Sequence, residues 1–82
     1  MNLNKMLYRS LHRGCKETDI LLGDFAIKLL NSLNEEELKV YEQLLEENDW
    51  DIYNWILNEE ENLTPLHYTQ IISKIRDFNV NK

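Results

Sequence analysis

Cys15 and His12 are the residues whose types and spacing could support nucleophilic catalysis in this 82-residue chain. They lie three positions apart, and Cys15 stands just ahead of a predicted helix, where a thiolate could be stabilised. A cysteine nucleophile also needs a base that a third group orients, and no third group accompanies this pair. We therefore interpret the single cysteine as a packed residue at a helix junction, and we predict that the chain is not an enzyme.

The sequence also lacks the patterns that hold a metal ion or a dinucleotide. His12 and His67 are too far apart for a local metal motif, and one cysteine cannot build a structural zinc site. No G-x-G-x-x-G turn follows a predicted strand, so we expect the chain to hold no dinucleotide cofactor by itself. Binding to another macromolecule is therefore the predicted class of function.

The charges indicate what kind of partner that is. Within a net charge of -6, residues 1–16 hold four basic side chains and no acid, whereas residues 34–62 hold eleven acids and one lysine. An acidic middle repels nucleic acid, but a basic end beside it can orient a protein partner. The run Glu35, Glu36 and Glu37 has a structural explanation, because acids in the first turn of a helix complement its dipole.

Five helices are expected to position any site. Apolar residues at helical spacing predict helices over residues 3–13, 16–33, 34 onward, 48 or 49 to about 58, and 64 onward. Gly14 stops the first helix, and Gly23 marks close packing of the second. Asn34 and Glu37 form a capping box at the start of the third helix.

Further signals complete this outline. Thr64 and Pro65 begin the fifth helix. The fourth helix is apolar on more than one face, and we predict that its residues divide between core and partner-facing positions, with Trp55 mostly buried alongside Ile52 and Ile56. The residues expected to divide in this way are Trp50, Tyr53, Trp55 and Ile56. No stretch alternates as a strand does, and none approaches the roughly 18 continuous apolar residues of a membrane span. We predict an all-α, small five-helix bundle, a single domain over residues 1–82 with a frayed tail from residue 79.

Residues 13–19, which spell RGCKETD, are the strongest candidate for a binding site. A chain reversal at Gly14 would place an arginine at the end of one helix and two acids in the first turn of the next, on a protruding corner. The same residues have a structural explanation, because glycine stops helices and first-turn acids stabilise them. The pattern alone leaves both interpretations open.

At these residues the chain resembles the succinate dehydrogenase flavinylation factor family, whose signature is R-G-x-x-E-x-D. A second segment, DWDIYNW at residues 49–55, is similar to the family's D-x-D-[LI]-[FY]-x-W pattern, and the E-x-L-L spacing at residues 42–45 also agrees. The resemblance implies a five-helix bundle that binds the flavoprotein subunit of succinate dehydrogenase, with fumarate reductase as a second client. It also implies help in attaching FAD covalently to a histidine of that subunit, which holds the FAD.

The resemblance also implies which residues contact the flavoprotein. Arg13 would offer its planar donor fork to a carboxylate or carbonyl of the partner. Cys15 stands where many relatives have methionine, which favours packing over reactivity. The predicted partner-binding residues are Tyr8, Arg9, Arg13, Gly14, Glu17 and Asp19.

The sequence is also compatible with two other functions. A generic acidic helical adaptor would leave the corner as mere capping, and a small thiol enzyme would make Cys15 indispensable. The basic, amphipathic start is similar to a mitochondrial presequence, but its pattern continues into the predicted domain, so the predicted compartment is a bacterial cytoplasm. We expect the free chain to be a monomer without membrane insertion.

Overall fold

The computed structural model describes residues 2–58 and 63–82, and within them it contains five α-helices and no strand. The helices are α1 Leu3–Leu11, α2 Lys16–Leu29, α3 Glu35–Leu44, α4 Asp49–Leu57 and α5 Thr69–Asn81, with short 3-10 turns η1 Leu30–Ser32 and η3 Leu66–Tyr68. This confirms the predicted all-α five-helix bundle. Among the described residues, no helix combines the length and the apolar character that crossing a membrane requires.

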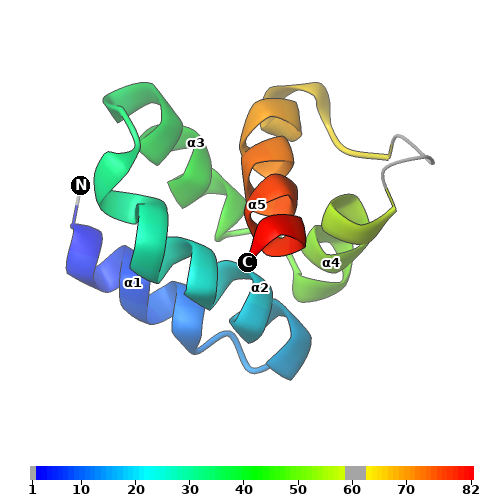
Figure 1. Ribbon diagram of the computed structural model, residues 1–82, viewed down its shortest axis with the longest axis horizontal. Coiled ribbons are helices and arrows are strands. Elements are labelled where there is room, and N and C mark those ends of the chain that lie inside the picture. Colours follow the sequence, from blue (N-terminus) through cyan, green and yellow to red (C-terminus); the bar gives the residue numbers. More distant parts are fainter. Residues whose placement is uncertain (1, 59–62) are drawn as a thin grey trace.

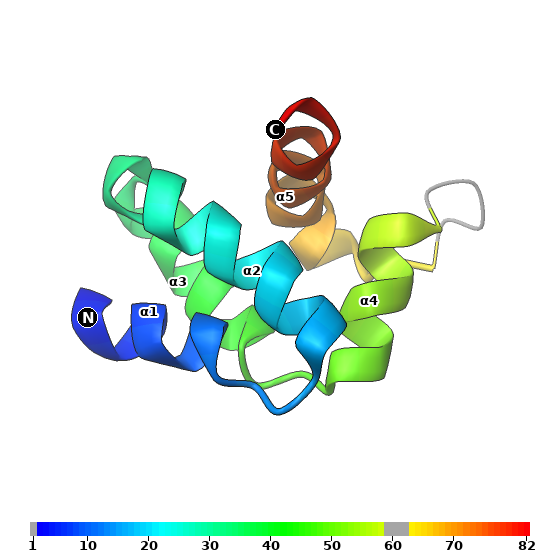
Figure 2. The same ribbon diagram turned by 60° about the horizontal axis from the view of Figure 1, so that its bottom comes forward.

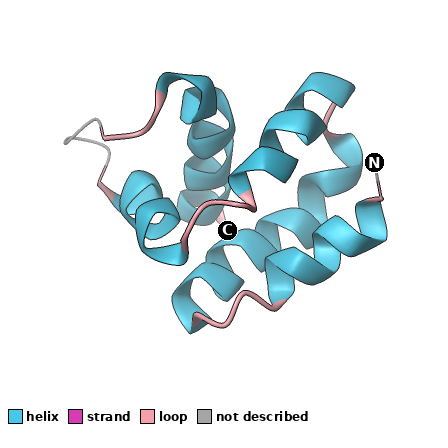
Figure 3. Ribbon diagram, turned by 180° about the vertical axis from the view of Figure 1, so that it is seen from behind, coloured by secondary structure: helices cyan, strands magenta, loops and turns pink. Residues whose placement is uncertain are grey.

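The second helix is the centre of the bundle. It contacts α1, α4 and α5, and Figure 1 shows α1 running alongside it with α4 and α5 on the other side. The view from behind, in Figure 3, shows the short loops that join α1 to α2 and α3 to α4. Leu22 and Phe25 of α2 are fully buried because neighbouring helices cover more than one of its faces.

Gly23 sets how closely α1 approaches α2. A Cβ atom built at Gly23 would lie 2.7 Å from Cδ2 of Leu11, which is nearer than real side chains come. The missing side chain therefore lets the two helices cross in close contact, as the sequence predicted.

The core gathers apolar side chains from all five helices. Phe25 lies at its centre, with its ring 5.8 Å from that of Tyr41 and 6.0 Å from that of Phe78. The buried apolar residues are Met6, Leu22, Phe25, Ala26, Leu30, Leu33, Tyr41, Leu44, Leu45, Ile52, Trp55, Ile56, Tyr68, Ile71, Ile72 and Ile75.

One polar pair inside this core was not foreseen. Ser10 is fully buried and donates its hydroxyl hydrogen to the carbonyl of Met6 at 2.8 Å. Its oxygen lies 2.6 Å from the hydroxyl of Tyr41, which therefore acts as the donor. Both hydroxyls are satisfied, so burying them carries no desolvation penalty from an unpaired group.

The predicted caps of α3 and α4 are present. The side chain of Asn34 accepts from the amide of Glu37 at 2.8 Å, and the Glu37 carboxylate accepts from the amide of Asn34 at 2.9 Å. Asn48, not Asp49, caps α4 by accepting from the amide of Asp51 at 2.9 Å. Because these bonds satisfy amides that a helix leaves free, they fix where α3 and α4 begin.

Four predicted boundaries differ from the structure. The first helix ends at Leu11 and not at Arg13, and the second ends at Leu29, ahead of η1. The fifth helix begins at Thr69, because residues 66–68 form a 3-10 turn in which the amide of Tyr68 donates to the carbonyl of Pro65. The tail expected to be frayed is helical as far as Asn81. Its contacts explain this order, since the Asn79 amide group donates to the carbonyl of Leu21 at 3.2 Å and Lys82 pairs with Asp24.

The two tryptophans of α4 provide a matched test of the core. Trp55 is 9% exposed and Trp50 is 69% exposed. Trp55→Ala should lower the free energy of unfolding by about 3–5 kcal/mol, because it leaves a cavity. Trp50→Ala should change it by no more than about 0.5 kcal/mol. Thermal or urea unfolding of both variants measures the difference, and equal losses would contradict the core assignment.

The buried hydroxyl of Tyr41 should make the stability of the fold depend on alkaline pH. Burial raises the pKa of Tyr41 from 10.0 to about 12, so the unfolded chain loses this proton first. The stability that Tyr41 contributes should be complete below pH 10 and fall by up to about 2 kcal/mol as the pH rises toward 12. Urea unfolding at a series of pH values should show a shallower decline for Tyr41→Phe. Identical declines would mean that the hydroxyl is not buried.

Candidate functional site

The turn between α1 and α2 forms the corner that the sequence singled out. α1 ends at Leu11 and α2 begins at Lys16, and we call residues 13–19 the corner. Gly14 has a φ of 91°, in the left-handed region that favours glycine, and it is exposed. Nothing lies within 4 Å of the position that its Cβ atom would take. The backbone of the corner is therefore open to a close approach from outside.

Arg13 holds this corner against the connection between α3 and α4. Its Nε donates to Oδ1 of Asp49 at 2.5 Å, and its two terminal nitrogens donate to the carbonyls of Leu45 and Glu47 at 2.9 and 2.7 Å. The side chain is only 9% exposed. Because carbonyls at the end of a helix lack partners within it, the guanidinium caps the C-terminal end of α3. We call these four residues the Arg13 clamp.

The clamp gives Arg13 a role inside the chain. Each of its three nitrogens donates one hydrogen bond within the chain, which uses three of the five N–H groups of the guanidinium. Asp19 has an internal role too, because its Oδ1 accepts from the backbone amide of Arg13 at 2.7 Å. That bond also explains why α1 stops short of Arg13. Direct contact of either residue with a partner stays a prediction.

The two sequence motifs meet at Asp49. Asp49 opens the 49–55 segment, and its Oδ1 lies 2.5 Å from Nε of Arg13 and 3.0 Å from the hydroxyl of the buried Thr18. Figure 2 shows the α1–α2 turn beside the connection that leads into α4. Thr18 was not among the predicted site residues, and only its place inside the first motif could have drawn attention to it.

Arg9 adds a second cation to the end of α3. It lies 3.3 Å from the carbonyl of Leu45 and 3.1 Å from a carboxylate oxygen of Glu46. Positive charge at the C-terminal end of a helix is favourable, because the helix dipole is negative there. The basic end and the acidic middle of the chain thus bind each other in part. Tyr8 is instead 64% exposed, with its ring 4.3 Å from that of His12.

Glu17 and Cys15 lie on the outer side of the corner. The pKa of the Glu17 carboxylate is lowered mainly by a hydrogen bond from the backbone amide of Glu17 and, to a smaller extent, by one from the thiol of Cys15. The carboxylate is charged at neutral pH. The sulfur of Cys15 lies 3.3 Å from that carboxylate. The thiol acts as a hydrogen-bond donor in this contact, which gives no support to a thiolate nucleophile. Glu17 and its neighbour Lys16 are the exposed charged residues of the corner.

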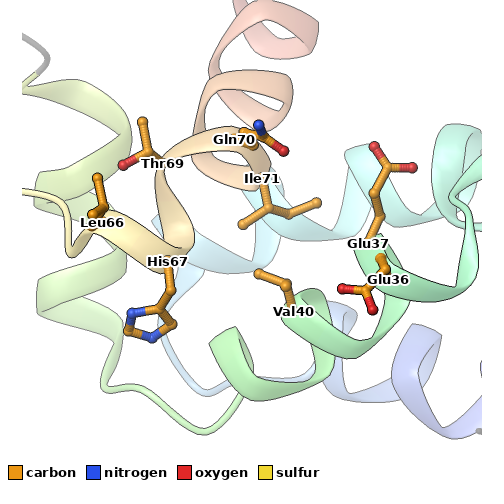
Figure 4. Close-up of a pocket in the computed structure, with 8 residues that line it drawn as sticks. All are labelled: Glu36, Glu37, Val40, Leu66, His67, Thr69, Gln70 and Ile71. Carbon is orange, nitrogen blue, oxygen red and sulfur yellow. The ribbon is translucent and has the colours of Figure 1, made fainter.

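A hollow elsewhere on the molecule is the alternative site. It has a volume of about 500 Å³ and lies between α3 and the segment from η3 into α5 (Figure 4). Val40 and Ile71 point toward one another in it, and Glu37 is paired with Lys74. Its lining residues are Glu36, Glu37, Val40, Leu66, His67, Thr69, Gln70 and Ile71. No predicted partner-binding residue lines it, and residues 2–58 and 63–82 contain no cluster suited to a metal ion.

Comparison with known proteins identifies the family. A family model described as "flavinator of succinate dehydrogenase" matches residues 4–79. The chain belongs to this family. The match confirms the resemblance seen in the two motifs and extends it into α5.

Family members from yeasts are the most informative relatives. A protein of Candida glabrata is 43% identical over 81 residues, which cover 95% of this chain and 53% of the relative. One from Kluyveromyces lactis is 42% identical over 82 residues, covering 95% and 50%. Both are named succinate dehydrogenase assembly factor 2, mitochondrial. The chain spans about half the length of these curated relatives.

These names overturn the predicted bacterial cytoplasm. The relatives in the two yeasts and in Saccharomyces cerevisiae are named as mitochondrial proteins. The prediction failed because it relied on the basic, amphipathic start of the chain, which forms α1 of the bundle. A folded helix of this kind is compatible with any compartment, so its pattern carried no information about location.

The clamp can be tested by a pair of matched substitutions. Arg13→Lys should lower the free energy of unfolding by about 1–3 kcal/mol, because one ammonium cannot reach both carbonyls and Asp49 in the same geometry. Arg9→Lys should cost much less, since Arg9 is more exposed and its bond to Leu45 is 3.3 Å long. Urea unfolding measures both. If Arg13→Lys left the chain as stable as the wild type, a structural clamp would be ruled out.

Proposed function

We propose that this chain is an assembly factor for succinate dehydrogenase that binds the flavoprotein subunit and promotes the covalent attachment of FAD to a histidine of that subunit. The family membership supports this proposal, and so do the names of the relatives. The chain acts as a helper and not as an enzyme, and the partner holds the FAD. Fumarate reductase is proposed as a second client.

The corner is the proposed docking site, and the observation that carries this is the open backbone at Gly14. With no Cβ atom and nothing within 4 Å of where one would be, this turn can take a partner's backbone or side chain in close contact. Glu17 places a charged carboxylate beside it. Because Arg13 and Asp19 fix the turn from inside, little conformational entropy is lost on binding.

This arrangement lets the chain assist a reaction without supplying a reacting group. Binding energy that holds the partner's histidine against the 8α position of the flavin ring lowers the barrier through orientation. The chain would also promote the reaction if it bound only one of the domain orientations that the partner already adopts, because binding would increase the population of that orientation. Tyr8 and Arg9, on the last turns of α1, extend the docking surface from the corner.

Two first-turn acids test the proposal. Glu17 is the second residue of α2 and Glu36 is the second residue of α3, so the two have the same position relative to a helix dipole. Glu17→Gln should reduce covalent flavin on the succinate dehydrogenase flavoprotein subunit, in cells that lack the native factor and carry the variant instead. The melting temperature of the Glu17→Gln variant should change little, since a first-turn acid contributes only about 0.3–1 kcal/mol to the free energy of unfolding.

The control is Glu36→Gln, which should leave covalent flavin unchanged. Glu36 lines the hollow beside α5, so the same control also tests whether that hollow is the docking site. In-gel fluorescence of the flavoprotein subunit measures covalent flavin. Full flavinylation by the Glu17 variant would favour a generic helical adaptor. The corner residues would then be explained by helix capping alone.

A further inference from the structure

The fourth helix is apolar on two opposite faces. Ile52, Trp55 and Ile56 point into the core, with exposures of 0%, 9% and 1%. Trp50 and Leu57, seven positions apart on the other face, are 69% and 53% exposed. The outer face is therefore not explained by the packing of the bundle.

Trp50 is held in a defined position on this outer face. Its ring stacks on that of Tyr53, one turn along α4, with 5.7 Å between the ring centres and 20° between the planes. One side of the indole rests on Tyr53, and the side chain as a whole remains largely in solvent. Tryptophan is costly to leave exposed and is enriched among residues that dominate binding energies. A pre-stacked, exposed tryptophan is suited to receive a partner.

The Arg13 clamp ties the corner to the start of the helix that carries this aromatic pair. Trp50 directly follows Asp49, which accepts from Arg13 and lies 3.0 Å from the hydroxyl of Thr18. The clamp thus fixes the first turn of α4 relative to the corner. Leu66, which is 90% exposed, lies by contrast on η3 and lines the separate hollow, without any such link.

The charges around the pair indicate the chemistry of its partner. Asp51, which follows Trp50 in the first turn of α4, is exposed and accepts from the amide group of Asn48, and α4 contains no basic residue. The amide group is neutral and leaves the negative charge of Asp51 in place. A cation that lies over an indole face is attracted to it, and nearby carboxylates strengthen that attraction.

We propose that Trp50 and Tyr53 form a second contact with the flavoprotein subunit, continuous with the corner, and that they receive an arginine or lysine beside apolar side chains of that partner. This inference rests on the proposed function, because it takes the same partner. It adds an aromatic anchor on α4 to a docking site that was so far built from α1 and α2. The guanidinium or ammonium group lies over Trp50, in the acidic first turn of α4.

Binding of the purified chain to the recombinant flavoprotein subunit from its own organism tests this contact. Trp50→Ala should weaken the affinity about tenfold or more, because a central aromatic anchor is lost. Trp50→Phe should recover part of the affinity. Leu66→Ala, which removes an even more exposed apolar side chain, should bind as the wild type does. Raising the salt concentration should weaken the wild type more than Trp50→Ala.

A second measurement needs no variant. The chain has two tryptophans, so labelling with 5-fluorotryptophan gives one fluorine signal from Trp50 and one from the core. Unlabelled flavoprotein should shift or broaden the Trp50 signal beyond the change that slower tumbling causes in the Trp55 signal. If the wild type binds but Trp50→Ala binds equally well and both signals change alike, the aromatic contact is overturned while the proposed function stands. If the wild type does not bind at all, the proposed function fails and this inference fails with it.

Discussion

The hydrogen bonds of one guanidinium group hold together the parts of this protein that matter for its function. Arg13 joins the α1–α2 turn to the last carbonyls after α3 and to the first residue of α4. Lysine could not do this, because its single ammonium group is a point charge, whereas the arginine fork presents several donors in one plane. These bonds hold the corner and the first turn of α4 in one fixed arrangement.

The signature of the family divides into an inner and an outer set. Arg13 and Asp19 are bonded inside the chain, whereas Gly14 and Glu17 face outward. A substitution at an inner residue changes the shape of the corner, and one at an outer residue changes what the corner presents. Loss of function at the two sets would thus have different physical causes, although the residues lie within one short motif.

The charged residues divide in the same way into those paired inside the chain and those exposed on its surface. Basic residues of α1 and the corner neutralise the C-terminal end of α3, where the helix dipole is negative, and pair with Glu46 and Asp49. The carboxylates of Glu17 and Asp51 are instead exposed, and they hydrogen bond with neutral groups. The charges that a protein partner meets are therefore those left on the surface after these internal pairs have formed.

The sequence by itself determined the helices, most of their caps and the family. Spacing of apolar residues and the box at Asn34 and Glu37 are local signals, since they act over one or two helical turns. It could not determine that Arg13 points inward, because the acceptors lie 32 to 36 residues away. It did predict that Trp55 is mostly buried alongside Ile52 and Ile56, and the structure confirms this. Packing between distant segments, and not local pattern, decided the direction in which Arg13 points.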